Sequence, residues 1–373
     1  MLTPILHEQL PYQESLFEDM ARAHALLVHS EPGQTPIPWE EVLGIGLDQA
    51  IRASHVLHHV VVRSGGRYDA AILDMPNFQD IFTRVAPRSE IEATASLFTS
   101  SIGDLRRARA AADERVLIPE MLERYAFNPL ISHPLVDLGA RGVWAPQTMF
   151  IPRALLGPNL YYKGLDRWGK SFADGLGKRV ETYVGKQLGL ISGIQLHPEV
   201  EYAKDMRSID WLWVTDEAVI LVECKAARMP LDAQAGGETL ESVMKRYIGH
   251  ARGQIDKTAR LIRERHPAFD HIPKDRQIVG VITTAEPFYL ADTPFAGFIS
   301  TGEVPAMTMS LRELEVLVGY SEPEAAALVI EQAHRGDDGG RFIAKFTDEA
   351  LRRENPILED AWRAFDFLEH GAT

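Results

Sequence analysis

The sequence predicts an α/β protein, of α+β type, in which a mixed central sheet is flanked by helices and carries helical additions at both ends. Short apolar runs bounded by turn residues, such as residues 218–222, are typical of buried strands. Longer segments with apolar residues every three or four positions are typical of amphipathic helices. Both kinds of segment occur between residues 160 and 318, whereas residues 1–128 and 319–373 show mainly helical spacing.

Residues 1–128 are predicted to form a helical N-terminal domain. Its helices are expected over residues 12–28, 39–62, 77–83 and 89–112, where helical spacing is punctuated by Pro and Gly. Residues 129–159 combine repeated Pro with aromatic and aliphatic residues, which indicates an ordered, extended connector rather than a flexible linker.

Residues 160–318 carry the predicted sheet, and residues 319–373 an acidic helical appendage. In order, we expect a helix over 171–188, an edge strand over 194–202, a hairpin of strands 209–214 and 218–225, a helix over 238–265, strands over 277–284 and 306–310, and a helix over 311–318. Two further helices are expected in the appendage, over 322–334 and 347–370.

The hairpin is the most informative part of the chain. Asp210 stands at the start of its first strand, and Glu223 and Lys225 stand near the end of its second. Antiparallel pairing would set the two carboxylates side by side, and the period of two puts Glu223 and Lys225 on one face. Two carboxylates and an amine at one edge of a hairpin are what metal-assisted phosphodiester hydrolysis requires.

A third carboxylate belongs to the helix expected over residues 171–188. Glu181 lies beside its apolar stripe, and the residues one turn away on either side are Gly177 and Gly185. Both glycines are expected to leave open space around this carboxylate, which we place in the same site.

A helix Glu, then an Asp, then Glu-x-Lys resembles the PD-(D/E)xK nuclease superfamily over roughly residues 160–318. Carried over residue by residue, the resemblance implies that Glu181, Asp210, Glu223 and the backbone carbonyl of Cys224 hold Mg²⁺ or Mn²⁺. The metal would polarise the scissile phosphate and lower the pKa of a bound water, and Lys225 would orient or deprotonate that water. Ile209 stands where the family name has Pro.

The resemblance further implies a metal-dependent endonuclease, acting on DNA rather than RNA, and such enzymes are often parts of restriction, repair or anti-phage defence systems. Some members carry a Gln on the helix after Glu-x-Lys, which makes Gln254 a candidate for positioning the phosphate or base. An amide bonded to backbone or water is the alternative for Gln254. A protein that keeps the fold without catalysis would bind nucleic acid or a partner only.

Two other interpretations of these segments stay open. Asp, Glu and Lys on a hairpin are usually solvated surface residues, although Glu223 follows the apolar run 219–222, where an unpaired charge would be costly. The residues from Gly164 to Ser171 also satisfy the P-loop pattern of nucleotide-binding proteins. Bulky residues between its glycines and only a short strand before it, over residues 160–162, argue against a phosphate loop.

Charge is distributed unevenly over the 373 residues, whose net charge is -14. Residues 160–285 contain 19 bases and 17 acids, whereas residues 286–373 contain 7 bases and 17 acids. Cations on the helix over 238–265 could contact phosphates, although the more usual interpretation is that such cations are solvated on the helix surface. These nucleic-acid-binding candidates are Lys245, Arg246, Arg252, Lys257 and Arg260, followed by Arg263.

Composition sets the remaining expectations. The chain holds one Cys, no run of 18 apolar residues, and no basic segment followed by a long apolar core at its start, which together predict a cytoplasmic protein without a membrane partner. The helical N-terminal region is the expected contact for a second copy of the chain or for a partner subunit.

Overall fold

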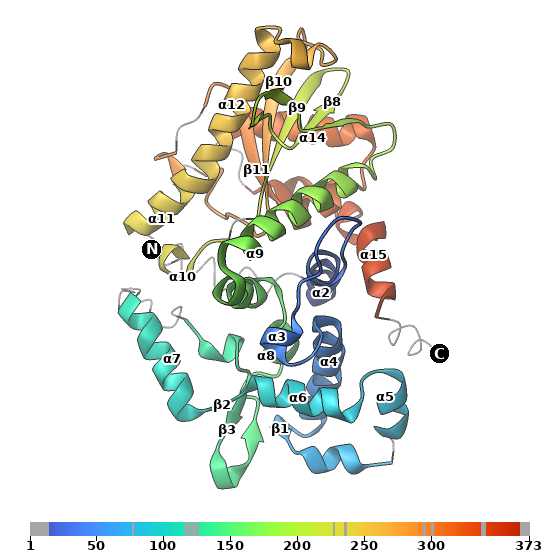
Figure 1. Cartoon of the computed structure of the whole chain (residues 1–373), viewed down its shortest axis with the longest axis vertical. Helices are drawn as coiled ribbons and strands as arrows, with labels where there is room; N and C mark the ends of the chain where they lie inside the picture. The colour runs from blue at the N-terminus through green and yellow to red at the C-terminus, as the bar shows by residue number, and fades with distance from the viewer. Residues whose placement is uncertain are drawn as a thin grey trace. The chain divides into compact units, whose positions relative to one another are not determined.

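The computed structural model describes residues 15–76, 78–115, 120, 123, 127–226, 228–234, 237–293, 296–299, 302–336 and 341–365 (Figure 1). These residues divide into two compact units. The sheet unit comprises the described residues from 176 to 355, and the helical unit comprises those from 15 to 175 and from 356 to 365. Helices and mixed sheets together confirm the expected α/β class.

The sheet unit is built on a five-stranded sheet in the order β11-β10-β9-β8-β5. β9, β10 and β11 are parallel, and β8 runs antiparallel to both of its neighbours. A separate ribbon pairs β6 with β7. The strands are β5 (Gln195–Pro198), β6 (Glu201–Ala203), β7 (Met206–Arg207), β8 (Trp211–Val214), β9 (Ala218–Lys225), β10 (Gln277–Thr284) and β11 (Ala306–Ser310). The predicted hairpin and the two later strands are therefore confirmed.

Helices cover both faces of this sheet (Figure 1). One face packs against α11 (Gly237–Met244), the π-helical turn η7 (Lys245–Gly249) and α12 (His250–Arg263). The other face packs against residues 176–188 of α9 (Gly157–Leu188), against α13 (Leu311–Leu317) and against α14 (Glu322–Arg335). Burial on both sides explains why β9 and β10 are nearly continuous apolar runs. Gly280 permits the close approach of α12, because a Cβ there would lie 2.9 Å from Ile255.

Short helical segments complete the sheet unit. They are α10 (Leu231–Gln234), η8 (Pro267–Phe269), η11 (Phe342–Lys345) and η12 (Ala350–Arg352). The helix predicted over 238–265 is present as α11, η7 and α12 in succession, and those predicted over 311–318 and 322–334 are present as α13 and α14.

The helical unit contains a small sheet as well as its helices. Its strands, in the order β1-β4-β3-β2, are β1 (Arg67–Tyr68), β4 (Val143–Trp144), β3 (Leu135–Asp137) and β2 (Thr99–Ser101). Its helical segments are α2 (Leu16–Ala23), η2 (His24–Val28), α3 (Glu40–Leu43), α4 (Leu47–Arg63), η3 (Ala70–Asp74), α5 (Phe78–Arg84), α6 (Arg88–Phe98), α7 (Ile102–Arg115), η5 (Pro129–Ile131), η6 (Gly139–Arg141), α8 (Phe150–Arg153), the residues of α9 up to 175, and α15 (Pro356–Arg363).

Several expectations for the ends of the chain are wrong in detail. The N-terminal region is not purely helical, since the helix expected over 89–112 is interrupted after Phe98 by β2, which pairs with β3. Residues 129–159 are not a separate connector, because β3, β4 and α8 lie in them and belong to the helical unit. Each of these strands is two or three residues long, too short for a period of two to show.

The C-terminal appendage also differs from its prediction. Within the described residues, the only α-helix between 347 and 365 is α15, which begins at Pro356, a favourable residue for a first helical turn. Leu358 and Ala361 pack against Ala21 of α2, so α15 belongs to the helical unit. Residues 366–370 of the predicted helix lie outside the described residues, as do residues 12–14 of the first one.

The P-loop interpretation is overturned by the backbone. The residues from Gly164 to Trp168 are helical, and so are residues 160–162, where a strand was expected. Gly169 interrupts the helix with φ 59° and ψ -137°, and the helix resumes at once. A Cβ at Gly164 would lie 2.4 Å from the ring of Phe172, so a side chain of α9, rather than a phosphate, occupies the space beside this glycine.

In the part of the chain that the structure describes, no helix combines the length and the apolar character needed to cross a bilayer.

Candidate functional site

The β8-β9 hairpin brings Asp210 and Glu223 together. The register pairs Trp211 with Val222, so one further step places Asp210 opposite Glu223. The backbone N–H of Cys224 donates to Oδ2 of Asp210 at 2.6 Å. Because the N–H and C=O of one strand residue point to the same side, the Cys224 carbonyl is directed toward the edge where Asp210 lies.

Lys225 joins this pair to helix α12. Its ammonium donates to Oε1 of Glu223 at 2.5 Å and to Oε1 of Gln254 at 2.8 Å. Four of the residues singled out in the sequence therefore form one cluster at the end of β9. The ammonium has three N–H groups, so one is left to donate to a ligand beyond these two bonds.

Burial and like charge raise the pKa values of the two carboxyls. Removal from water is the main cause for Asp210, whose pKa rises to about 6, and the charge of Glu223 adds to it. The pKa of Glu223 is also raised by burial, against the opposing effect of the Lys225 ammonium. One ammonium therefore does not compensate both carboxylates.

Glu181 reaches the same region from α9. Burial raises the pKa of its carboxyl, and the nearby charge of Asp210 raises it further. Gly177 has open space around it, as expected. The expectation for Gly185 is wrong, because a Cβ there would lie 2.1 Å from the indole of Trp211, which fills the space that the glycine leaves.

The donor set of this cluster fits a hard divalent cation in part. Oε2 of Glu223 is buried and has no hydrogen-bond partner among the described residues. A cation would bond this oxygen and offset the repulsion between the carboxylates. Within those same residues, no three side chains of His, Cys, Asp or Glu gather as a ready-made metal cage. Mg²⁺ seldom needs one, since one or two carboxylates, waters and substrate oxygens usually complete its shell.

The predicted nucleic-acid-binding cations differ in their exposure to solvent. Lys245, Arg246, Lys257 and Arg260 are exposed. Lys245 pairs with Glu241 and Arg260 pairs with Glu303 at 3.2 Å, whereas Arg246 and Lys257 lie over the rings of Tyr247 and Tyr202 at 5.4 and 5.3 Å. These four remain available to a polyanion.

Arg252 is not such a cation. It is buried, and its guanidinium lies 3.8 Å from Oδ1 of the half-buried Asp292, whose Oδ2 accepts a hydrogen bond from the Thr308 backbone N–H at 2.6 Å. Spacing in the sequence could have shown this, because residue 252 shares one helical stripe with Ile248 and Ile255.

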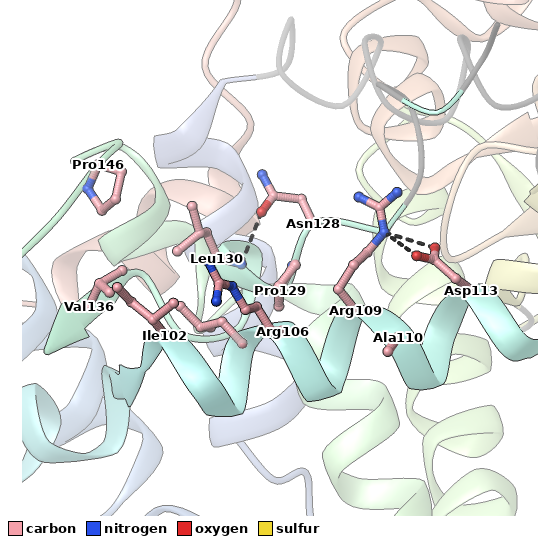
Figure 2. A pocket seen from close by; sticks show the side chains of 11 residues that line it. Ile102, Arg106, Arg109, Ala110, Asp113, Asn128, Pro129, Leu130, Val136 and Pro146 are labelled. Atoms are coloured by element: carbon pink, nitrogen blue, oxygen red, sulfur yellow. Dashed lines mark hydrogen bonds and ion pairs between the residues drawn. The ribbon is translucent and has the colours of Figure 1, made fainter. Parts of the chain in front are cut away.

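A groove of about 440 Å³ in the helical unit lacks the features of a catalytic site (Figure 2). It is mostly apolar and runs beside α7, where Arg109 is bonded to Asp113. Its lining residues are Ile102, Leu105, Arg106, Arg109, Ala110, Asp113, Asn128, Pro129, Leu130, Val136 and Pro146. The pair of carboxylates with raised pKa values lies in the other unit, at the end of β9.

Comparisons with known proteins add little to this description. No family model matches the chain, and no curated protein matches it either. Among solved structures, the small subunit of the heterodimeric restriction endonuclease R.BspD6I is similar at 13% sequence identity and a TM-score of 0.26, covering 51% of this chain and 88% of that subunit.

Proposed function

We propose that the protein is a metal-dependent nuclease of PD-(D/E)xK type that hydrolyses phosphodiester bonds in DNA at the end of strand β9. The observation that carries the proposal is the cluster of Asp210, Glu223, Lys225 and Gln254, in which Asp210 and Glu223 are neighbours across the end of the hairpin. Carboxylate pairs with raised pKa values and a paired amine are characteristic of functional sites.

Asp210, Glu223 and the Cys224 carbonyl would hold Mg²⁺ or Mn²⁺, with Glu181 adding negative charge from α9. A bound ion supplies Lewis-acid stabilisation of the charge that develops on the phosphate. The pKa values of all three carboxyls are raised, mainly by burial, so the charged forms of these groups are not fully compensated by the surrounding protein. Binding a divalent cation would favour their charged forms.

Lys225 would act on the nucleophile and the phosphate. Held between Glu223 and Gln254, its ammonium keeps a fixed position and a third N–H, which can orient the attacking water or donate to a phosphate oxygen. Gln254 then has a positioning role, because its carbonyl oxygen fixes the ammonium and its amide N–H groups can donate to the substrate.

DNA would approach over α11, η7 and α12, on the face of the sheet where Lys225 meets Gln254. The exposed cations Lys245, Arg246, Lys257 and Arg260 would contact phosphates without reading sequence. Salt should weaken such binding steeply, because phosphate contacts release counterions.

Cleavage of supercoiled plasmid DNA by the purified protein with Mg²⁺ or Mn²⁺ tests the proposal, since a circle has no ends and reports endonuclease activity. Asp210→Ala, Glu223→Ala and Lys225→Ala should each lower the rate by about a hundredfold or more. Lys345→Ala, which removes an ammonium paired with Glu331, should leave it unchanged. Full cleavage by Lys225→Ala would reject the assigned mechanism, and binding of DNA without cleavage by the unaltered chain would identify a catalytically silent protein with this fold.

A further inference from the structure

We infer that Trp211 is a positioning residue that fixes Glu181 beside the Asp210–Glu223 pair by packing its indole against Gly185 of α9. The inference rests on the proposed metal site and names a residue that the sequence motif does not contain. Trp211 is the first residue of β8 and directly follows Asp210.

Two contacts join Trp211 to α9. Its indole N–H donates to the backbone carbonyl of Glu181 itself, at 3.0 Å. Its ring lies against Gly185, where the atoms Cζ2, Cε2 and Cη2 of the indole would be 2.1 to 2.6 Å from any Cβ. The hydrogen bond fixes the helix along its axis, and the ring in the glycine gap fixes how closely the helix approaches the sheet.

Because of the chain geometry, these two contacts fix the position of Glu181 relative to Asp210. Consecutive strand residues point to opposite faces, so Asp210 faces the side of Glu223 while Trp211 faces α9. Because the two residues share a peptide bond, the indole ties the backbone of Glu181 to the residue next to Asp210. The hydrogen bond and the ring contact therefore fix the distance between the backbone that carries Glu181 and the backbone that carries Asp210.

The chain supplies matched controls for both contacts. Trp213 lies two residues further along β8, on the same face, and donates its indole N–H to Glu322 of α14 at 3.2 Å. Gly177 lies one turn before Glu181, as Gly185 lies one turn after it, and has nothing within 4 Å of a Cβ. Trp213→Phe and Gly177→Ala therefore repeat the chemical changes without touching the contact between Trp211 and α9.

The test measures Mn²⁺ binding to the whole 373-residue chain without DNA, and the free Mn²⁺ is quantified by electron paramagnetic resonance. Trp211→Phe keeps an aromatic ring but removes the N–H donor, and Gly185→Ala places a methyl group against the indole. Each should raise the Kd for Mn²⁺ about tenfold, as is usual when a residue that orients a metal ligand is changed. Trp213→Phe and Gly177→Ala should bind as the unaltered chain does.

Plasmid cleavage at rising Mn²⁺ concentration gives the second readout. Trp211→Phe should need about tenfold more Mn²⁺ for half-maximal rate and should recover nearly full kcat at saturation. Equal Mn²⁺ affinity in Trp211→Phe and Trp213→Phe overturns the inference, and so does a loss of kcat that Mn²⁺ does not restore.

The two proposals fail in distinguishable ways. If the unaltered chain cleaves DNA and Trp211→Phe matches Trp213→Phe, the nuclease assignment stands and the role of Trp211 falls. If Mn²⁺ binding weakens as expected but no variant or unaltered chain cleaves, the role of Trp211 stands and the nuclease assignment falls. If the unaltered chain binds no Mn²⁺, both fall.

Discussion

Asp210→Asn should make the metal-free protein more stable at pH 8, although it removes a residue of the proposed metal site. Asn keeps an oxygen that can accept the Cys224 N–H, but it carries no charge to repel Glu223. The pKa of Asp210 is about 6 in the folded chain against 3.8 for an unperturbed carboxyl. A difference of this size corresponds to about 3 kcal/mol at most, and because Asp210 is only half-buried we expect a gain of about 1 to 2 kcal/mol.

Proton linkage determines how the stability difference between Asp210→Asn and the unaltered chain changes with pH. A carboxyl whose pKa is raised by folding contributes its stability in the protonated form, fully below pH 3.8, and loses it as the pH rises through about 6. Asn cannot ionise, so the stabilities of the variant and the unaltered chain should converge near pH 4, diverge as the pH rises from about 4 to about 6, and keep a constant difference above that. Mn²⁺ should close the gap by stabilising the unaltered chain alone, because only that chain keeps the proposed carboxylate ligand.

Native-state hydrogen exchange of the β9 amides measures this free energy within the sheet unit. Asp216→Asn, which removes a carboxylate from the exposed turn of the same hairpin, is the control and should change the opening free energy by less than about 0.5 kcal/mol. A variant at position 210 that is less stable than the unaltered chain at pH 8 would refute the reasoning, since it would mean that the carboxylate is already compensated without a metal.

Two further predictions concern buried polar groups of the sheet unit. Burial raises the pKa of Asp292 to about 7, so the stabilising contribution of its protonated form is lost as the pH rises from 4 to 7. Asp292→Asn can still accept the Thr308 N–H, so its free energy of unfolding in urea should rise relative to that of the unaltered chain over this interval. A difference between the two chains that stays constant from pH 4 to 7 would contradict this prediction. Asn355→Ala should lower the free energy of unfolding by about 1 to 3 kcal/mol, because Asn355 and Gln187 exchange hydrogen bonds at 2.7 and 3.3 Å in a buried network. The amide oxygen of Gln187 would lose the Asn355 donor, while its Nε2 would keep its bond to the Tyr183 hydroxyl. A change below about 0.5 kcal/mol would contradict this prediction.

The hairpin and its charges were predictable because local signals agree with the final packing. The apolar run before Glu223 fixes β9 as an interior strand, and three residues from 215 to 217 fix the turn. Period-two alternation then places Glu223 and Lys225 on one face, where the structure has them. No contact distant in sequence is needed for this part of the argument.

The remaining features depend on partners far away in the chain. Gly185 appeared to leave open space because nothing near it in sequence fills the gap, yet an indole 26 residues later does. Arg252 appeared to be a surface cation because its partner Asp292 is supplied by the segment between β10 and β11. The strands of the helical unit escaped notice because pairing between distant segments, rather than alternation, defines them.

The position of the candidate site at a strand end also has a physical reason. β9 lies between two neighbours, and its residues from 218 to 222 are almost completely buried, so the sheet is rigid there and stabilised by apolar burial. At Glu223 the adjacent strand β8 has ended, and side chains rather than a backbone ladder bond the outer edge of β9. At this point Glu223 is buried and Asp210 is half-buried, so their mutual repulsion is screened less than in water, and their attraction to a cation would be strengthened by the same cause. The electrostatic cost in the metal-free chain and the proposed affinity for metal would therefore have the same origin, so Asp210→Asn should raise stability while it abolishes the proposed activity.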